Sequence, residues 1–360
     1  MSYPVLYDAT ETNFASNGFG FLSDCVQCEV TEEANGAFTM VMRYPIDGIH
    51  FSDIANGGIV KAILDRNREP QLFRIYSISK PMSKVVTILA NHISYDLSGI
   101  PVSPFSATSA RTALEGLKSN SAADCPFDFW TDREIDGNFS VPVPSSIRSR
   151  LGGAKGTILE TFGGEYEFDN FTVKLYNSRG QDRGVSIRYG KNLLDINQEE
   201  NISSVVTGVY PYWVDSNDDN MVQLPEKVVL APGTYSFSKI IPLDLSGAFD
   251  EKPTESEMRS FVETYLRENE VGVPAVSLSV SFAQIDQSQE YKHLNLIERV
   301  SLFDTISVDF PLLKVSTKAK VVKMVHDVLL DRVKSANIGS VKENIADTIA
   351  RLQVSQNEKE

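Results

Sequence analysis

The sequence predicts an α+β fold that is rich in β-strands and divided into more than one domain. Three observations predict it. The chain has 360 residues, which exceeds the roughly 150 residues typical of one domain. Short runs of β-branched and aromatic residues, separated by turn signals, recur along most of it. Helical spacing of apolar residues is confined to a few stretches.

The first hundred residues read almost entirely as strands. Asn35 and Gly36 stand between two alternating segments, which predicts a hairpin. Further strands are predicted at residues 57–64, 71–80 and 84–93. Four or five strands within such a short stretch predict a small barrel or sandwich.

Residues 103–187 change character and predict a compact α+β insertion. A Ser/Thr cluster precedes apolar residues at helical spacing in 106–120, so a helix is expected there. Thr157 and Glu160 form a capping box for a second, short helix. The remaining predictions for this region are a strand at 126–132, a loop at 145–153, and an alternating hairpin formed by 165–180 and 184–190.

The rest of the chain alternates between strand and helix patterns. Thr254 and Glu257 form a capping box that opens a helix with one apolar stripe. Ser340 and Glu343 form another, which predicts a C-terminal helix. Strands are predicted at 201–213, 276–285, 298–311 and 319–330, and the polar segment 213–227 is predicted to be an exposed loop.

Composition excludes several classes of protein. The 34 basic and 48 acidic residues leave a net charge of −14, which repels phosphate backbones and disfavours nucleic-acid binding and acidic partners. The N-terminus lacks the pattern of a signal peptide, and no run of about 18 apolar residues predicts a membrane segment. Three cysteines suit a protein made in a reducing cytoplasm, without disulfides.

Cys25 and Cys28 form a single C-x-x-C motif, which is the spacing found in zinc sites and redox pairs. A zinc site needs further soft ligands, and none lies nearby in the sequence. Cys125 stands alone. We therefore interpret the cysteines as structural residues and predict no metal site.

The candidates for catalysis are equally sparse. His92 and His326 have a carboxylate close in sequence, but neither lies in a G-x-S-x-G or H-E-x-x-H motif, so both are interpreted as packed histidines. Glu165 and Glu167 are interpreted as a solvated strand face rather than a glycosidase pair. The glycine-rich segment 152–157 lacks the order of a phosphate-binding loop. We predict no catalytic, cofactor-binding or metal-binding residue, no cofactor, and no enzyme activity.

Several segments in a fixed order resemble the N-terminal region of phage tail-associated lysins, the prophage tail endopeptidase family. The resemblance extends over nearly the whole chain. It is carried by residues 30–48, 71–80, 88–97, 162–193, 207–213 and 303–332.

The resemblance implies the fold of phage baseplate hub proteins: two small β-barrel-like domains with α+β insertions. It divides the chain into four parts. We expect a first, discontinuous barrel-like domain at 1–102 with 188–213, an insertion at 103–187, a second α+β or barrel domain at 214–335, and a C-terminal helix at 336–360 that leads to any downstream segment.

The resemblance also implies a function. A structural tail-tip protein of this family forms a homotrimer that closes the tail tube, and it links the distal tail protein to host-contacting parts. Its expected partners are the distal tail protein, the tape measure protein and receptor-binding or other baseplate proteins. DNA passes through the ring without specific binding. The expected place is the virion tail tip, after assembly in the bacterial cytoplasm.

Two alternatives stay open at this point. One is a peptidoglycan-degrading tail endopeptidase acting through His92 or His326, although in this family the hydrolase lies C-terminal to the hub region. The other is a carbohydrate-binding tail module, for which the aromatic residues of 127–130 and 207–213 supply stacking surfaces.

Overall fold

The computed structural model describes most of residues 3–339. Short gaps interrupt this range, and the described part excludes residues 66–67, 80, 83, 191, 202–204, 216–217, 247, 250–251, 269–270, 273–274, 283–299 and 314. The chain forms two compact units, Met1–Asn197 with Leu278–Ser340 and Gln198–Ser277 with Val341–Glu360. Each unit is described by itself below.

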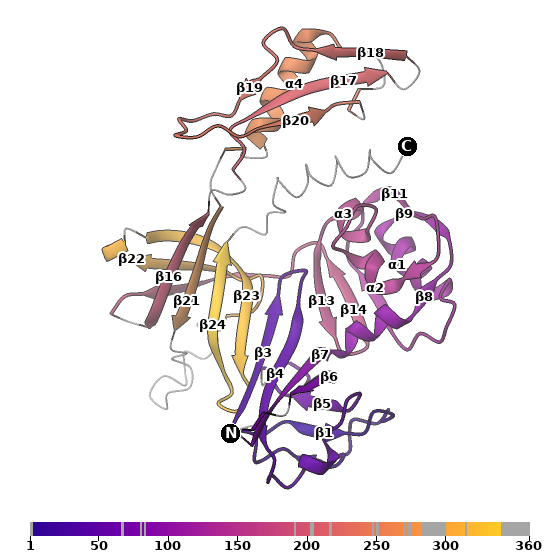
Figure 1. Ribbon diagram of the computed structural model, residues 1–360, viewed down its shortest axis with the longest axis vertical. Coiled ribbons are helices and arrows are strands. Elements are labelled where there is room, and N and C mark those ends of the chain that lie inside the picture. Colours follow the sequence, from indigo (N-terminus) through magenta and orange to yellow (C-terminus); the bar gives the residue numbers. More distant parts are fainter. Residues whose placement is uncertain are drawn as a thin grey trace. The chain divides into compact units, whose positions relative to one another are not determined.

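A 13-stranded sheet dominates the first unit (Figure 1). Its main path runs in the order β16-β21-β24-β23-β3-β4-β7-β6-β5-β1-β2, and β22 joins it by pairing with β23 and β15. The strands are β1 (Val5–Tyr7), β2 (Gly20–Phe21), β3 (Gln27–Glu33), β4 (Phe38–Pro45), β5 (Ile59–Ala62), β6 (Gln71–Ser79), β7 (Val85–His92), β15 (Asp182–Arg188), β16 (Leu193–Asn201), β21 (Ala275–Phe282), β22 (Thr305–Phe310), β23 (Val315–Asp327) and β24 (Arg332–Gly339).

Local sequence explains the central strands. In β3, β4 and β7 buried residues alternate with more exposed ones, as expected of strands with one face on a core. The predicted hairpin between β3 and β4 is confirmed, and Asn35 at its turn has a φ of 53°. Asn tolerates this left-handed conformation better than most residues.

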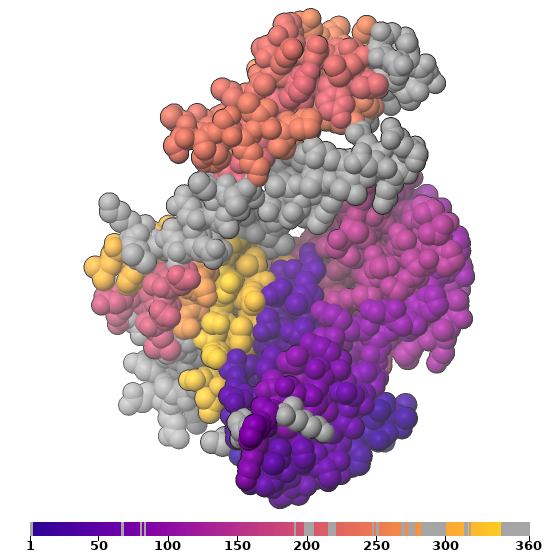
Figure 2. Space-filling view, viewed as in Figure 1, coloured from indigo at the N-terminus to yellow at the C-terminus, as the bar shows by residue number. Residues whose placement is uncertain are grey.

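The joint between the two ends of the sequence is the strand β23. Its first half pairs with β22, and its second half pairs with both β24 and β3. Figure 2 shows the yellow C-terminal strands lying directly against the indigo N-terminal ones. A strand near residue 320 therefore completes a sheet that begins near residue 5.

Two large hydrophobic cores and a smaller cluster around Tyr7 lie on the described part of this sheet. One is shared by the N-terminal strands and the insertion, and Phe38, Met42 and Leu114 are among its members. The other lies among the C-terminal strands and includes Phe303 and Val321. The predicted α+β, β-rich fold is confirmed.

The insertion follows β7 and packs on the N-terminal core. Its helix α1 begins with a reciprocal capping box between Ser109 and Thr112. The predicted helix at Thr157 is confirmed. The hairpin predicted from 165–180 and 184–190 is wrong, because the turn at Asn170 closes a hairpin of β13 and β14 within 165–180. The strand β15 instead pairs in parallel with β22 of the large sheet. The elements are η2 (Ile93–Gly99), β8 (Pro101–Val102), β9 (Phe105–Ser109), α1 (Ala110–Ser119), β10 (Asp128–Thr131), β11 (Asp136–Val141), β12 (Ser145–Ser146), α2 (Ile147–Leu151), α3 (Ile158–Phe162), β13 (Glu165–Asp169) and β14 (Thr172–Tyr176).

Two further local predictions are wrong. The segment 145–153 was predicted to be a loop, but it contains the short helix α2. The side chain of Ser146 caps this helix by accepting the backbone N–H of Ser149. The helix is also held by burial of its Ile147 and Leu151 side chains. The segment 213–227 was predicted to be an exposed loop, but β17 (Gly208–Asp215) and β18 (Asp218–Gln223) form a hairpin in it. Buried Trp213 and Leu224 give that hairpin a core face despite its polar composition.

The second unit contains a four-stranded sheet and one helix. The strand β17 pairs with β18, with β19 (Val229–Leu230) and with β20 (Ile240–Asp244). The helix α4 (Glu255–Glu268) begins with the predicted capping box, in which Thr254 Oγ1 accepts Glu257 N and Glu257 Oε2 accepts Thr254 N. Met258, Val262 and Leu266 of the helix contribute to a separate core with Trp213.

The predicted C-terminal helix lies almost wholly outside the described residues. β24 continues to Gly339, so residues 336–339 are strand, while 340–360 are not described. The four-part division of the chain stays a prediction. None of the described helices is long and apolar enough to cross a membrane.

Candidate functional site

An ion pair is buried where the N-terminal strands meet the insertion. Glu32 of β3 and Arg68 are joined at 2.9 Å, and Glu32 is only 6% exposed. Arg68 also donates to the carbonyl of Phe168 in the insertion at 2.9 Å. Burial raises the pKa of Glu32, but Arg68 and then Arg179 outweigh burial, so that the net pKa lies below its usual value. Glu32 is therefore an ionised carboxylate held inside the protein.

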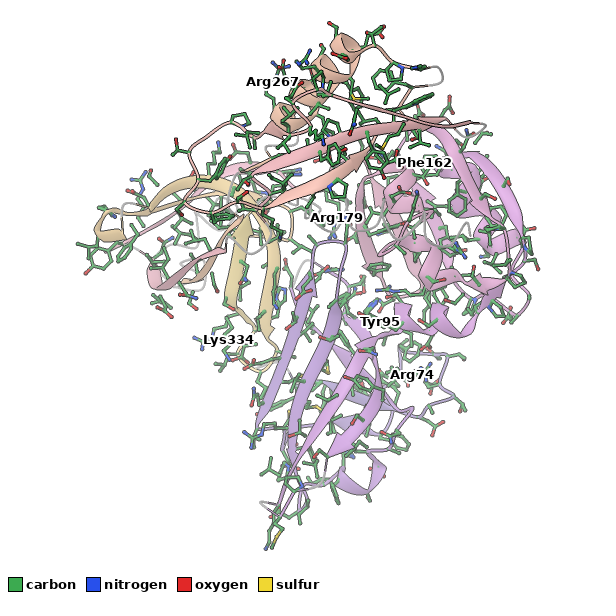
Figure 3. The ribbon with its side chains drawn as sticks, turned by 45° about the horizontal axis from the view of Figure 1, so that its top comes forward. Arg74, Tyr95, Phe162, Arg179, Arg267 and Lys334 are labelled. Carbon is green, nitrogen blue, oxygen red and sulfur yellow. The ribbon has the colours of Figure 1, made fainter. Side chains whose placement is uncertain are left out.

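Glu165 and Glu167 extend this charged cluster, so the predicted solvated face is wrong. Glu165 is 8% exposed and pairs with Lys320 of β23 at 2.5 Å. Glu167 lies 3.6 Å from Arg179 and 3.5 Å from Lys174. Figure 3 labels Arg179 in this region. Glu165 therefore ties the insertion to the sheet through Lys320, whereas both partners of Glu167 lie within the insertion.

Two asparagines lock the insertion onto the sheet from opposite sides. Asn35, in the turn of β3–β4, donates to Gly164 O at 3.0 Å and accepts Tyr166 N at 2.8 Å. Asn170, in the turn of β13–β14, donates to Pro70 O at 3.0 Å and accepts Leu72 N at 2.9 Å. The side chain in each turn therefore supplies hydrogen-bond partners to backbone groups across the boundary between the sheet and the insertion.

His92 is a packed residue of the first unit. It is completely buried, its Nδ1 lies 3.0 Å from Ser94 Oγ, and its Nε2 lies 3.1 Å from Gln71 Oε1. Its ring stacks on Phe38 with centroids 4.3 Å apart. Burial, followed by the nearby charge of Arg68, holds the pKa of His92 well below its usual value. The imidazole is therefore held in its neutral form.

His326 occupies a less satisfied site on β23. It is 7% exposed, and apart from a weak interaction with the backbone of Leu64 neither ring nitrogen has a hydrogen-bond partner among the described residues. Burial lowers the pKa of His326, and the opposing effect of Glu32 is smaller. His92 and His326 are thus both near the Glu32–Arg68 pair, which links them to one buried cluster.

The cysteines do not form a metal centre. Among the described residues, no group of three or more His, Cys, Asp or Glu side chains is placed to hold a metal ion. Cys25 and Cys28 are both buried and are free thiols, whereas Cys125 is partly exposed. Cys25 Sγ lies 3.1 Å from Gln27 O and 3.5 Å from Arg43 O.

The glycine-rich segment 152–157 leads into α3. Thr157 Oγ1 accepts Glu160 N at 3.4 Å, and Glu160 Oε2 accepts Gly156 N at 3.0 Å. The backbone donors at this helix start are therefore satisfied from within the segment. This arrangement agrees with the interpretation of the segment as a helix entry.

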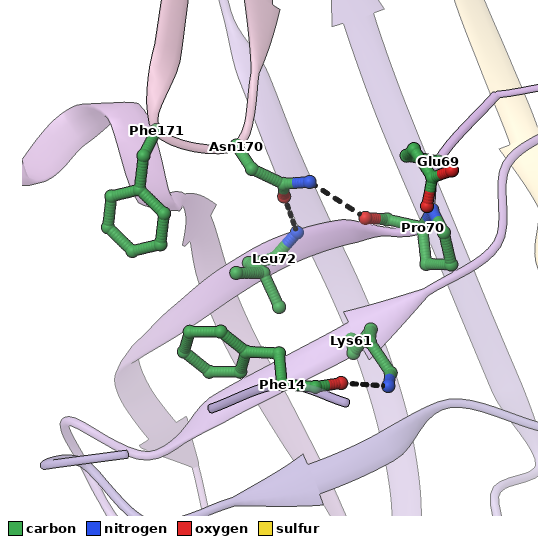
Figure 4. A pocket seen from close by; sticks show the side chains of 7 residues that line it. All are labelled: Phe14, Lys61, Glu69, Pro70, Leu72, Asn170 and Phe171. Carbon is green, nitrogen blue, oxygen red and sulfur yellow. Dashed lines mark hydrogen bonds between the residues drawn. The ribbon is translucent and has the colours of Figure 1, made fainter. Parts of the chain in front are cut away.

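One pocket lies between the sheet and the β13–β14 turn, with a volume of about 290 Å³ (Figure 4). Phe14 and Phe171 stack at its wall with centroids 6.2 Å apart. Lys61 Nζ donates to Phe14 O at 2.6 Å. The pocket is also lined by Glu69, Pro70, Leu72 and Asn170.

The aromatic residues proposed for sugar stacking divide into two kinds. Trp213 is 5% exposed and donates its indole N–H to Phe249 O, so it belongs to the core of the second unit. Trp130 is 44% exposed and lies against Tyr176 with ring centroids 5.0 Å apart. Sequence spacing could not separate the two, because burial is set by the tertiary structure.

Comparison with known proteins gives the fold a context. Residues 181–349, a little under half of the chain, match the family model described as prophage endopeptidase tail. The resemblance is confirmed. No curated protein matches the chain at a significant level.

Three solved structures are similar over almost their whole length. The prophage tail protein gp18 from Listeria monocytogenes EGD-e has a TM-score of 0.59 at 14% identity, with 98% of each chain covered. The tail protein from Neisseria meningitidis MC58 has a TM-score of 0.54 at 8% identity, and the match covers 94% of this chain and 96% of that one. The 43 kDa tail protein of prophage MuSo2 from Shewanella oneidensis has a TM-score of 0.53 at 12% identity, and the match covers 87% of this chain and 92% of that one. The chain has the fold of these tail proteins.

Proposed function

We propose that the chain is a structural hub protein of a phage or prophage tail tip. In this role it forms a homotrimer that closes the tail tube and joins a distal tail protein to host-contacting parts. The observation that carries the proposal is the match to prophage tail protein gp18 over 98% of both chains. A match of this extent includes both units, not a single shared module.

Open sheet edges support self-association. Among the described residues, the main path of the large sheet ends at β2 and at β16, and β15 pairs only with β22. An unpaired edge is a template for further strands, and closed oligomers are a common way of covering it. In a three-fold ring, each such edge would pair with a neighbouring copy, so the edges would be covered and the oligomer would be closed.

Absence of hydrolysis is part of the same proposal. The only two histidines considered as bases are 0% and 7% exposed, and both lie beside the buried Glu32–Arg68 pair. A general base must reach the proton that it removes. Purified chain, and its His92→Gln and His326→Gln variants, should therefore leave peptidoglycan uncleared in zymograms.

The acidic balance suits a ring through which DNA slides. A net charge of −14 repels phosphate. We expect that adding the chain at low salt does not retard the migration of double-stranded DNA in a gel. Retention of DNA that weakens steeply as salt rises would contradict an acidic channel.

The deciding experiment measures mass and partner binding. The chain should have the light-scattering mass of a trimer, either alone or after addition of the distal tail protein from the same phage. Negative-stain images of the trimer should show a ring. A chain that stays monomeric and does not bind the distal tail protein would overturn the proposal.

A further inference from the structure

The four-stranded sheet of the second unit uses only one of its faces for the core of that unit. On this face, Val209 and Trp213 of β17 pack in one core with Met258 of α4 (Figure 1). Side chains alternate between the two faces of a strand, so the residues between these two point away from α4. In β17 they are Tyr210, Tyr212 and Val214.

Strand pairing adds apolar side chains of the neighbouring strands to this outer face. They are Met221 opposite Val214, Pro242 opposite Tyr210, and Leu230 and Ile240 on the two sides of Gly208. Met221, Leu230 and Ile240 are 51%, 67% and 42% exposed. We call these four residues, together with Tyr210, Tyr212 and Val214, the outer patch. A contiguous apolar surface of this kind marks a contact site.

The chain leaves the large sheet beside the point where the second unit is attached. Ile338 of β24 pairs with Leu278 of β21, and the second unit ends one residue earlier, at Ser277. The two strands are antiparallel, so the chain that follows Gly339 starts next to this attachment point. Residues 341–360 belong to the second unit. The segment after β24 therefore starts at the unit that carries the outer patch.

The sequence of this segment predicts a helix with one apolar side. After the predicted capping box at Ser340, four apolar residues recur at helical spacing: Val341, Ile345, Ile349 and Leu352. As a helix, residues 341–352 are about 18 Å long. The outermost axes of four neighbouring strands lie about 14 Å apart, so a helix of this length crosses the sheet. Such a short helix is marginal in water and needs a surface on which to pack its apolar side.

We infer that residues 341–352 form a helix that docks on the outer patch of the same chain. The sheet of the second unit then has a helix on each face, with α4 on the other one. Attachment to the same chain gives the segment an effective concentration on the order of millimolar, which favours it over a second copy as the occupant. Anything that follows residue 352 then leaves from the second unit and not from the large sheet. The docking does not depend on the trimer of the proposed function.

Hydrogen exchange of the full-length chain, measured by mass spectrometry, tests the docking. The amides of 341–352 should exchange at least about tenfold more slowly in the unsubstituted chain than in a Met221→Lys, Ile240→Lys double variant. Both positions are exposed, so α4 should exchange as before. Ile49→Lys is the control, because Ile49 is 75% exposed and belongs to the first unit. Equal exchange at 341–352 in the unsubstituted chain and the double variant would overturn the inference.

A second variant changes the segment and leaves the patch intact. Ile345→Asp with Ile349→Asp should speed exchange at 341–352 to the same extent and leave α4 unchanged.

Refolding the two double variants together identifies the occupant. Docking within one chain leaves the intact segment of the Met221→Lys, Ile240→Lys chains unprotected in the mixture. Recovery of its protection would show docking on the intact patch of a second copy and would overturn the inference. A chain that forms the trimer and binds its distal tail protein, but exchanges rapidly at 341–352, would leave the proposed function intact and reject this inference alone.

Discussion

At the scale of single residues, the most informative feature is that charge is buried for structural reasons. Glu32 and Arg68 are paired inside the first unit, and Arg68 also holds Phe168 of the insertion. Removing one partner of such a pair leaves an uncompensated charge, whereas replacing both with apolar residues is often tolerated. The pair is therefore expected to be sensitive to single substitution and insensitive to double substitution.

Arg68→Met should destabilise the chain by about 3–5 kcal/mol, because Glu32 would stay buried without its partner. Glu32→Leu combined with Arg68→Met should recover most of that loss. Urea unfolding measures both. The matched control is Lys118→Met, which removes the exposed pair with Asp128 at 2.6 Å and should cost less than about 1 kcal/mol. Equal losses for Arg68→Met and Lys118→Met would contradict a structural role for the buried pair.

His92 predicts a dependence of stability on pH. Its pKa is depressed in the folded chain, so the unfolded chain takes up the proton first as pH falls below about 6.5. The buried neutral ring therefore contributes its full share to the free energy of unfolding above that pH. Below that pH this free energy falls by up to about 1.4 kcal/mol per pH unit. His92→Gln should flatten the decline of unfolding free energy between about pH 7 and about pH 5. An unchanged slope would show that other groups cause the decline.

At the scale of elements, two hairpin turns do more than reverse the chain. Asn35 has a φ of 53° and Asn170 has a φ of 50°, and each side chain reaches the backbone of the opposite part. The sequence identified the turn at Asn35 but not its contact with Gly164. Turn chemistry is local, whereas the docking partner depends on how the insertion packs.

Asn170→Gly isolates this docking from backbone strain. Glycine accepts a positive φ freely, so the variant keeps the turn and loses the two side-chain bonds to Pro70 and Leu72. We expect a loss of about 2 kcal/mol, since each bond contributes about 1 kcal/mol. Gly99→Ala is the control, because a Cβ at Gly99 meets no atom within 4 Å. Asn170→Gly without any shift in the urea midpoint would rule out docking by this turn.

At the scale of the whole molecule, the two units are expected to unfold separately. The second unit has its own core, in which α4 packs its buried side chains with Trp213, while Glu32 and Arg68 belong to the first unit. Because each core is complete within its unit, a substitution in one should leave the transition of the other unchanged.

Thr254→Ala tests this independence. Loss of the cap of α4 should cost about 1 kcal/mol. In a Trp130→Phe background, Trp213 is the only tryptophan and reports on the second unit. Its fluorescence transition should move to lower urea with Thr254→Ala and stay in place with Arg68→Met. Ser260→Ala, an exposed position of the same helix, is the control. Coincident movement with both substitutions would show one cooperative unit.

The sequence by itself determined most of the strands and helices, where helices α3 and α4 begin, and which family the chain resembles. Periodicity, capping boxes and turn residues act over a few neighbouring positions, so they can be read locally. It missed the hairpin β17–β18, because a polar composition concealed the buried Trp213 and Leu224.

Only the tertiary structure decided that β23 pairs with β3, that Glu165 meets Lys320, and that Cys25 and Cys28 are both buried. The first two contacts join residues far apart in the sequence, and no local pattern specifies such a partner. For the thiols, the spacing was visible but the burial was not. Partner choice and burial follow from how the cores pack, which is a property of the whole fold.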